Sequence, residues 1–275
     1  MANFNVADVK VLRERTGAGM VDSKNALVEA EGDIEKAIEI LRLKGLKQVS
    51  KREDRSTSEG LVAAKTVEGA TTIIELGTET DFVAKNEKFI ALADKVLEAV
   101  AAAGAGSLEE ALAAPGGRGT VADLITDEAA ILGEKIELRK VARVEGQEFA
   151  VYLHKTSKDL PPQVGVVVAY TGSDADTARG IAQHVAMFDP AFLSRDEVPA
   201  DAVENERRIV TEIATAEGKP EAALPKIIEG RLTGFFKERV LLDQGYAKDS
   251  KVAVAKILDD AGLAVQSFVR FKVGA

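Results

Sequence analysis

Apolar residues recur at helical spacing in three short segments within the first 45 residues of the chain. From Ile34 to Leu41 they follow the i, i+3, i+4, i+7 pattern, which lines one face of a helix. The pattern predicts a small bundle of three helices. The residues expected to cap these helices are Asn5, Asp22 and Asp33. Gly45 is expected to end the third helix.

A polar segment rich in serine and charged residues follows at residues 45–60. It lacks apolar periodicity and predicts a linker, helical at most at its start. Beyond it, apolar runs and alternation predict a strand hairpin, two helices and a third strand. These elements are expected at residues 60–67, 71–77, 89–100, 119–133 and 135–144.

The order of strand, turn, strand, corner and helix then occurs a second time, with weak sequence identity. We interpret the repetition as a structural duplication. The chain closes with an alternating strand pattern, in which one face carries Val269, Phe271 and Val273. The elements of this second unit are expected at residues 148–154, 164–172, 174–188 and 266–275.

Two long amphipathic helical patterns interrupt the second unit, on either side of the sequence EGKPEAALP. Two such helices joined by a short Gly/Pro turn predict an antiparallel helical hairpin. The expected fold is therefore α+β, with a three-helix module, a two-part core of antiparallel strands and an inserted hairpin. We expect the domains at residues 1–54, 55–145 and 146–275, with the hairpin at about 195–244.

Composition excludes several classes of protein. The formal net charge of the 275 residues is −9 and only 5% of them are aromatic, which disfavours binding to nucleic acid phosphates. The absence of cysteine excludes disulfides and cysteine-ligated zinc. The N-terminal sequence lacks a secretory signal pattern, and no apolar run approaches the ~20 residues that span a bilayer. We expect a cytoplasmic protein that binds neither nucleic acid directly nor a membrane.

Catalytic patterns are scarce in this sequence. The two histidines, His154 and His184, are far apart and lack the spacing of metal ligands. No glycine-rich phosphate loop or dinucleotide fingerprint is present. The many carboxylates lie on patterned helical faces, which is typical of solvated surfaces. The sequence favours a binding protein over an enzyme, with no predicted catalytic residue, metal site or cofactor.

The stretch RERTGAGM, at residues 13–20, allows two interpretations. A tight turn accounts for Gly17 and Gly19, because glycine readily adopts positive φ. Turn chemistry does not require Met20, however. An apolar side chain presented to a partner would account for that residue.

The stretch TETDFVAKNEKF, at residues 78–89, also allows two interpretations. Thr80 or Asp81 can cap the helix that follows. Phe82 lies seven residues before Phe89, so it either extends the core face of that helix or contacts a molecule outside the chain.

Both stretches resemble signatures of the bacterial translation elongation factor Ts family. LRERTGAGMVDSKNAL resembles its N-terminal signature and TETDFVAKNEKF its second one. The resemblance extends along nearly the whole chain through EGDIEKAIE, HVAMFDPAFL and EGRLTGFFKE. It implies guanine nucleotide exchange on the GTPase elongation factor Tu, bound in its GDP and nucleotide-free forms. It also implies a ubiquitin-associated-like N-terminal module, a two-part α+β core and a coiled-coil hairpin.

The resemblance further implies which residues meet the GTPase. In family members the Asp and Phe of TDFV reach the GTPase near its magnesium site, and they match Asp81 and Phe82. These two residues are flanked by Thr80 and Val83. The N-terminal signature contacts the same GTPase domain, and a histidine after a strand contacts another domain of the partner. The matching residues are Arg13, Met20, Val21 and His154.

The alternative is a passive binding or scaffold protein of the translation or nascent-chain machinery, which would bind without speeding nucleotide release. The sequence does not decide between a monomer, a homodimer and a 2:2 complex with the partner. Ser23 and Asn25 stand where the family often has Cys and Lys. Some members continue beyond the segment matching RFKVGA with a further helical module, whose contacts are not expected here.

Overall fold

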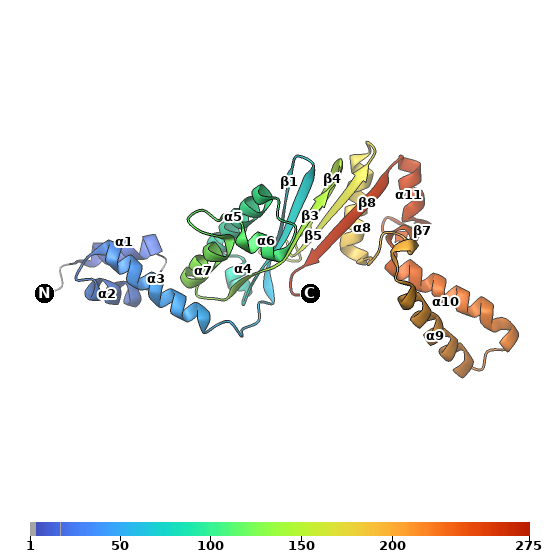
Figure 1. The fold of residues 1–275 in the computed structure, drawn as a ribbon, viewed down its shortest axis with the longest axis horizontal. Helices are drawn as coiled ribbons and strands as arrows, with labels where there is room; N and C mark the ends of the chain where they lie inside the picture. Colours follow the sequence, from blue (N-terminus) through green and yellow to red (C-terminus); the bar gives the residue numbers. More distant parts are fainter. Residues whose placement is uncertain (1–3, 17) are drawn as a thin grey trace.

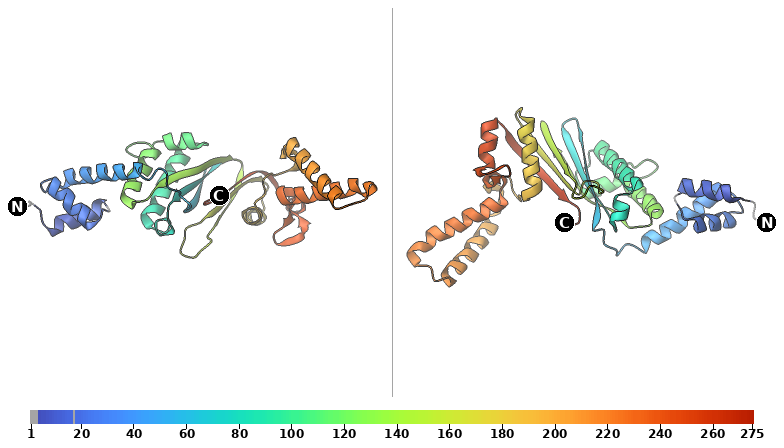
Figure 2. Two further views of the ribbon diagram at one scale, coloured as in Figure 1. Left: turned by 90° about the horizontal axis from the view of Figure 1, so that it is seen from below. Right: turned by 180° about the vertical axis from the view of Figure 1, so that it is seen from behind.

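The computed structural model describes residues 4–16 and 18–275, except the side chains of residues 46–48 and 50. The molecule is elongated, with three N-terminal helices at one end, two β-sheets in the middle and a helical hairpin at the other end (Figure 1). The same arrangement is seen from below and from behind (Figure 2). The predicted α+β architecture is confirmed. Gly17, assigned to a turn in the sequence, lies outside the described residues.

The N-terminal helices form the predicted bundle. They are α1 (Val6–Thr16), α2 (Met20–Glu29) and α3 (Ile34–Ser50). Asn5 Oδ1 accepts a hydrogen bond from the N–H of Ala7 at 2.7 Å, which confirms Asn5 as a cap. Asp33 Oδ1 accepts one from the N–H of Lys36 at 3.1 Å, which confirms the cap of the third helix. The apolar faces of the three helices meet in a small core of Val9, Leu12, Ala26, Leu27, Ala30 and Ala37.

The predicted cap at Asp22 is wrong. Helix α2 begins earlier, at Met20, and its N-cap is Gly19, which has no side chain to accept a hydrogen bond. Asp22 lies instead in the first turn of α2. A carboxylate in that position stabilises the helix through the positive end of its dipole.

The prediction that Gly45 ends the third helix is also wrong, because α3 continues through it. Gly45 packs against α7 (Val121–Leu132), and a Cβ on Gly45 would lie 2.7 Å from the Cβ of Ala130. Hydrogen bonds of 2.8 and 3.1 Å between Arg42 and Asp127 join the same two helices. The glycine therefore permits close packing of α3 on α7.

The first half of the core is a three-stranded antiparallel sheet with helices over one face (Figure 1). Its strands are β1 (Glu59–Val67), β2 (Ala70–Thr78) and β3 (Ile136–Glu145). Its helices are α4 (Asp81–Ala84), α5 (Glu87–Ala103), α6 (Leu108–Ala113) and α7. Phe89 and Leu92 of α5 belong to one buried cluster with Ile74 and Leu76 of β2.

The second half of the core repeats this topology. Its strands are β4 (Glu148–His154), β5 (Val164–Thr171) and β8 (Ala264–Lys272). Its helices are α8 (Ala175–Phe188) and α11 (Val254–Ala261), and a small ribbon is formed by β6 (Gly245–Tyr246) and β7 (Asp249–Ala253). In both halves the first two strands form a hairpin, and the third strand returns to pair with the second. The shared strand order confirms the predicted duplication.

The two sheets pack face to face. Val166 and Val168 of β5 belong to the cluster under α8, whereas Val167 between them belongs to the layer between the sheets. A Cβ on Gly165 would overlap Cγ1 of Val62, so the sheets approach closely at this position. The prediction that Val269, Phe271 and Val273 share one face of the last strand is confirmed, and this face lies in the layer between the sheets. The core thus has four layers, with helices outside and two sheets inside.

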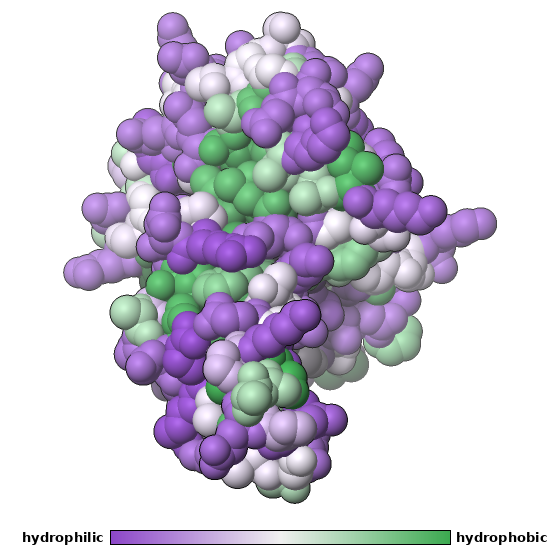
Figure 3. Space-filling view, turned by 90° about the vertical axis from the view of Figure 1, so that its right-hand side faces the viewer, coloured by the Kyte–Doolittle hydropathy of each residue, from purple (hydrophilic) through white to green (hydrophobic). Residues whose placement is uncertain are grey.

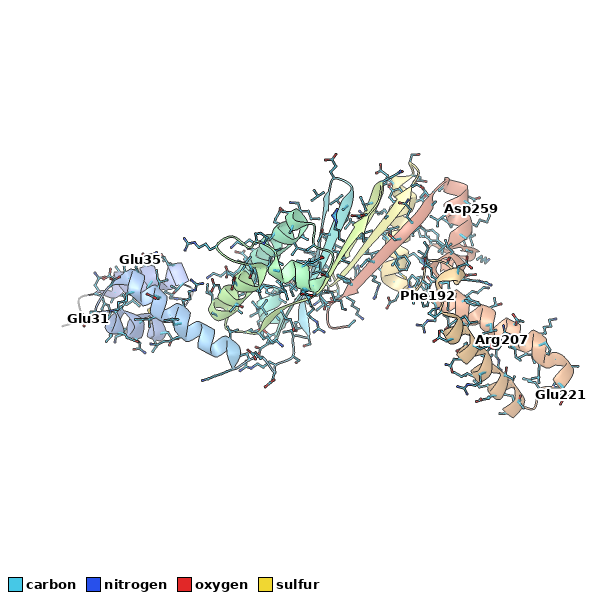
Figure 4. The ribbon with its side chains drawn as sticks, in the orientation of Figure 1. Glu31, Glu35, Phe192, Arg207, Glu221 and Asp259 are labelled. Atoms are coloured by element: carbon cyan, nitrogen blue, oxygen red, sulfur yellow. The ribbon has the colours of Figure 1, made fainter. Side chains whose placement is uncertain are left out.

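The predicted helical hairpin is formed by α9 (Ala200–Ala216) and α10 (Leu224–Arg239). Ion pairs of 2.7 Å join Arg207 to Glu229 and Arg231 to Glu217 across the two helices. Arg207 lies along the length of the hairpin and Glu221 lies at its tip (Figure 4). Three 3₁₀ turns flank or connect the helices, at Arg195–Glu197, Glu221–Ala223 and Leu241–Asp243.

The chain enters and leaves the hairpin at adjacent points of the core. Phe192 and Val240 form a parallel bridge, and the N–H of Leu241 donates to the carbonyl of Phe192 at 2.8 Å.

On the face that carries the hairpin, apolar surface gathers over the core and the hairpin itself is mostly hydrophilic (Figure 3). None of the helices described has the length and apolar composition needed to cross a membrane.

Candidate functional site

The TDFV stretch forms the corner between β2 and the helices that follow it. Thr80 has extended backbone angles and caps α4, because its Oγ1 accepts a hydrogen bond from the N–H of Val83 at 3.4 Å. Of the two predicted caps, Thr80 therefore has this role. Asp81 is the first residue of α4.

Phe82 is an exposed side chain on this corner. It is 74% exposed, whereas Phe89 is fully buried. Helix α4 is a single turn, and a new cap at Asn86 starts α5, with Asn86 Oδ1 accepting from the N–H of Lys88 at 2.9 Å. Because the helix is interrupted, the seven-residue spacing does not place both phenylalanines on one face. Val83 is buried, so it anchors the turn that presents Phe82.

Lys85 contacts both residues of the Asp-Phe pair. Its Nζ lies 3.3 Å from Asp81 Oδ2 and 4.6 Å from the centroid of the Phe82 ring. An exposed ion pair at this helical spacing contributes only about 0.3–0.5 kcal/mol. The side chains of Asp81 and Phe82 are therefore held loosely enough to exchange their contacts with Lys85 for contacts with a partner.

The residues of the N-terminal signature lie on α1 and α2. Arg13 lines a cleft of about 420 Å³ together with Lys10, Glu14 and Lys88, so the bundle and the start of α5 share one surface. Met20 and Val21, at the start of α2, are 50% and 70% exposed. Gly19 has φ −62° and ψ 155°, angles that any residue adopts, so a positive-φ turn at this position does not explain the glycine.

His154 lies at the exposed end of β4, in the other half of the core. Its Nδ1 is 3.0 Å from the hydroxyl of Tyr152. Arg179 of α8 lies over the ring of Tyr152, 6.0 Å from its centroid. The predicted site residues are therefore not all brought together: Arg13 shares a surface with the start of α5, whereas His154 lies in the other half of the core.

Two carboxylates at the corner were not identified from the sequence. Glu134, between α7 and β3, accepts hydrogen bonds from the hydroxyls of Thr78 and Thr80 at 2.8 and 2.6 Å. Glu79 accepts one from the N–H of Lys135 at 2.6 Å. Glu134 is 54 residues from Thr80 along the chain, and no local spacing signals such a contact.

The pKa of Glu79 is lowered by its partners. Burial opposes ionisation of the carboxyl group, but the hydrogen bonds from the N–H of Lys135 and from Arg55 outweigh it and hold the pKa below its usual value. The guanidinium of Arg55 lies 2.9 Å from Glu79. The carboxylate thus ties the segment after the bundle to the corner.

The chemistry of the corner favours protein binding. An exposed phenylalanine beside a carboxylate offers no pairing of a nucleophile with a base. Among residues 4–16 and 18–275, no group of three or more His, Asp and Glu side chains is arranged to hold a metal ion. The pattern of one exposed aromatic residue on a buried scaffold is typical of an interface anchor.

Comparison with known proteins identifies the family. The family model described as Elongation factor TS matches residues 79–275. Elongation factor Ts of Clavibacter michiganensis subsp. michiganensis is 70% identical over 275 residues, and those of Leifsonia xyli subsp. xyli and Micrococcus luteus are 66% and 58% identical over 276 and 277 residues. Each alignment covers 100% of both chains. The chain therefore belongs to the elongation factor Ts family, the non-catalytic nucleotide exchange factors of elongation factor Tu.

Proposed function

We propose that this chain releases GDP from elongation factor Tu through the corner that carries Asp81 and Phe82. The observation that supports this mechanism is the exposure of Phe82, at 74%, on a turn whose next residue is buried. Burying a phenylalanine side chain gains about 1.5–3 kcal/mol. Insertion of Phe82 between packed helices of the GTPase would supply that free energy at the point where the partner has to move.

The nucleotide of a GTPase is held through its phosphates and a bridging Mg²⁺. We propose that Phe82 acts as a wedge that shifts the segment ordering this magnesium site. Asp81, released from its weak pair with Lys85, would then compete with the groups that hold the ion. No covalent bond changes in this mechanism.

The effect is a coupling free energy between two binding events. The factor weakens the binding of GDP, and GDP weakens the binding of the factor by the same amount. The chain would therefore bind the GDP-bound GTPase, release the nucleotide and stay bound to the nucleotide-free form until GTP binds.

We propose further contacts on either side of the corner. Arg13, Met20 and Val21 would contact the same GTPase domain from the N-terminal bundle, and His154 would contact a second domain of the partner. The exposure of Met20 and Val21 supports this assignment. We also propose the domain division at residues 1–54, 55–145 and 146–275, with the hairpin at about 195–244.

The proposed contacts are compatible with a 1:1 complex and with a 2:2 complex that contains a homodimer of the factor. Light scattering of the purified complex would measure its mass. A 2:2 complex would have twice the mass of a 1:1 complex, and the same measurement on the free factor would give twice the mass of one chain if the factor is a homodimer. Membership of this bacterial family supports the expected cytoplasmic location.

The test of the proposed function is release of a fluorescent GDP analogue from elongation factor Tu. We expect the wild-type chain to accelerate release and Phe82→Ala to lose most of that acceleration. Val67→Ala is a matched control, because Val67 is an exposed apolar residue at the β1–β2 hairpin. A wild-type rate for Phe82→Ala would remove the wedge from the mechanism. Binding without acceleration by the wild-type chain would support the passive scaffold instead.

A further inference from the structure

We infer that Glu134 is a positioning residue for exchange, which holds the corner in the orientation that presents Phe82. The inference rests on the proposed role of Phe82. Glu134 lies between α7 and β3 and is only half-buried, and its contacts are with the residues that begin the corner. It would therefore act through Thr80.

The carboxylate of Glu134 receives three hydrogen bonds from two residues. Oε1 accepts from the hydroxyl of Thr80 at 2.6 Å, and Oε2 accepts from the hydroxyl of Thr78 at 2.8 Å and the N–H of Thr80 at 3.0 Å. Hydrogen bonds to an ionised acceptor are about twice as strong as neutral ones. One side chain thus fixes both the end of β2 and the backbone at the cap of α4.

The hydroxyl of Thr80 connects Glu134 to the helix that carries Phe82. It donates to Glu134 and accepts from the N–H of Val83, so the donation to Glu134 orients the oxygen for capping. Helix α4 has four residues, and a single turn is not stable without such contacts. Removing the carboxylate would free the hydroxyl to rotate and the turn to unwind.

A reciprocal contact strengthens this arrangement. Glu79 accepts from the N–H of Lys135, while Glu134 accepts from the N–H of Thr80. Each of the two segments therefore supplies a carboxylate to the backbone of the other. We call Thr78, Glu79, Thr80, Glu134 and Lys135 the corner brace. The brace fixes the corner against the α7–β3 connection, as the buried Val83 fixes it against the core.

The variants Glu134→Ala and Glu134→Gln separate positioning from a general loss of structure. Alanine removes all three hydrogen bonds. The amide of glutamine keeps an oxygen that can accept from the N–H of Thr80. Its NH₂ group can donate to a threonine hydroxyl, because a hydroxyl accepts hydrogen bonds as well as donating them. Glu145→Ala is the matched control, because Glu145 is an exposed residue of β3 that pairs with Arg143 at 3.3 Å.

The experiment measures release of the GDP analogue at increasing concentrations of the full-length factor. For Glu134→Ala we expect the maximal release rate to fall about tenfold, because the turn that presents Phe82 would be formed only part of the time once the three hydrogen bonds are lost. Glu134→Gln should recover most of the rate, and Glu145→Ala should match the wild type. In a Phe82→Ala background, Glu134→Ala should cause no further loss, because both changes remove the same wedge.

Hydrogen exchange of the backbone amides of residues 80–85 provides a second measurement that does not depend on the GTPase. We expect faster exchange there in Glu134→Ala, with exchange in β1 and in the part of β2 before Thr78 unchanged. The inference is overturned if Glu134→Ala releases GDP like the wild type, if its effect multiplies with that of Phe82→Ala, or if protection at the corner is unchanged. If Phe82→Ala alone releases GDP at the wild-type rate, the proposed function is overturned, whatever the protection against hydrogen exchange shows.

Discussion

Gly45 of α3 and Ala130 of α7 lie so close that a Cβ on the glycine would be 2.7 Å from the Cβ of the alanine. This contact joins the N-terminal bundle to the first half of the core, beside the ion pair of Arg42 and Asp127. The position of the bundle relative to the corner therefore depends on a residue without a side chain.

Gly45→Ala should displace α3 from α7 and slow GDP release, because Arg13 and the corner would no longer face the partner together. Replacing a helical glycine by alanine normally stabilises by about 1 kcal/mol. Gly230→Ala in α10 should show that gain, because the added Cβ would have no atom within 4 Å apart from its chain neighbours and the nearby backbone of its own helix. Calorimetry of both variants tests the contrast. Equal stabilisation by the two substitutions would mean that the close contact has no cost.

Ser23→Ala should stabilise the N-terminal bundle. Ser23 is fully buried, and its hydroxyl has no hydrogen-bond partner among the described residues. Removing an unpaired buried polar group gains about 1 kcal/mol. Hydrogen exchange of the amides in α1 to α3 would report the local free energy. Ser107→Ala should have the opposite sign, because Ser107 caps α6 in a reciprocal pair with Glu110.

His184 should make the free energy of unfolding depend on pH. Its Nδ1 accepts the N–H of Ala247 at 3.0 Å and its Nε2 lies 2.8 Å from Oε1 of Gln244, so the ring is neutral with its proton on Nε2. Burial lowers the pKa of His184, although the hydrogen bond to Gln244 opposes the shift. In the unfolded chain the imidazole has its ordinary pKa of about 6.5.

The unfolded state therefore binds more protons than the folded state below about pH 6.5, and stability falls as the pH decreases through that value. Above about pH 6.5 the contribution of His184 to the free energy of unfolding does not change with pH. His184→Gln should remove this slope from denaturant titrations between about pH 5 and 7. His154→Gln, at an exposed position, should retain it. An unchanged slope in His184→Gln would assign the pH dependence to other groups.

Glu75→Gln should destabilise the junction between the two sheets. The buried carboxylate lies 3.4 Å from Arg139, 3.1 Å from Lys140 and 3.3 Å from the N–H of Gly274. Removing one partner of a fully buried ion pair costs about 3 kcal/mol, and we expect a smaller loss here because the side chains of Arg139 and Lys140 are partly exposed to solvent. Chemical denaturation measures the loss. Glu145→Gln on β3 serves as the exposed control, and an equal effect of the two variants would contradict a role for burial.

Much of this fold follows from local patterns in the sequence. Apolar runs located the central strands β2 and β5 to within a few residues, because both faces of these strands are buried, one against helices and the other against the second sheet. The order of elements also predicted the duplication, because both halves repeat the same strand pairing.

Two of the errors have a common physical origin, a contact between residues that are distant in the sequence. Gly45 was assigned to a helix end because glycine often occupies that position, but its role depends on Ala130, which is distant in the sequence. Glu134 was missed for the same reason. The exposure of Phe82 has a local signal that could have been used, since Asn86 followed by Glu87 and Lys88 is a helix start that separates Phe82 from Phe89.

The adjacent positions of Phe192 and Val240 have a consequence for the evolution of this chain. A segment whose two ends meet at one bridge can change in length without altering the register in which β5 pairs with β8. The loop-closure entropy of such a segment grows only slowly with its length. The hairpin is therefore a site where insertions and deletions are tolerated, while the sheets and the corner that they support stay unchanged.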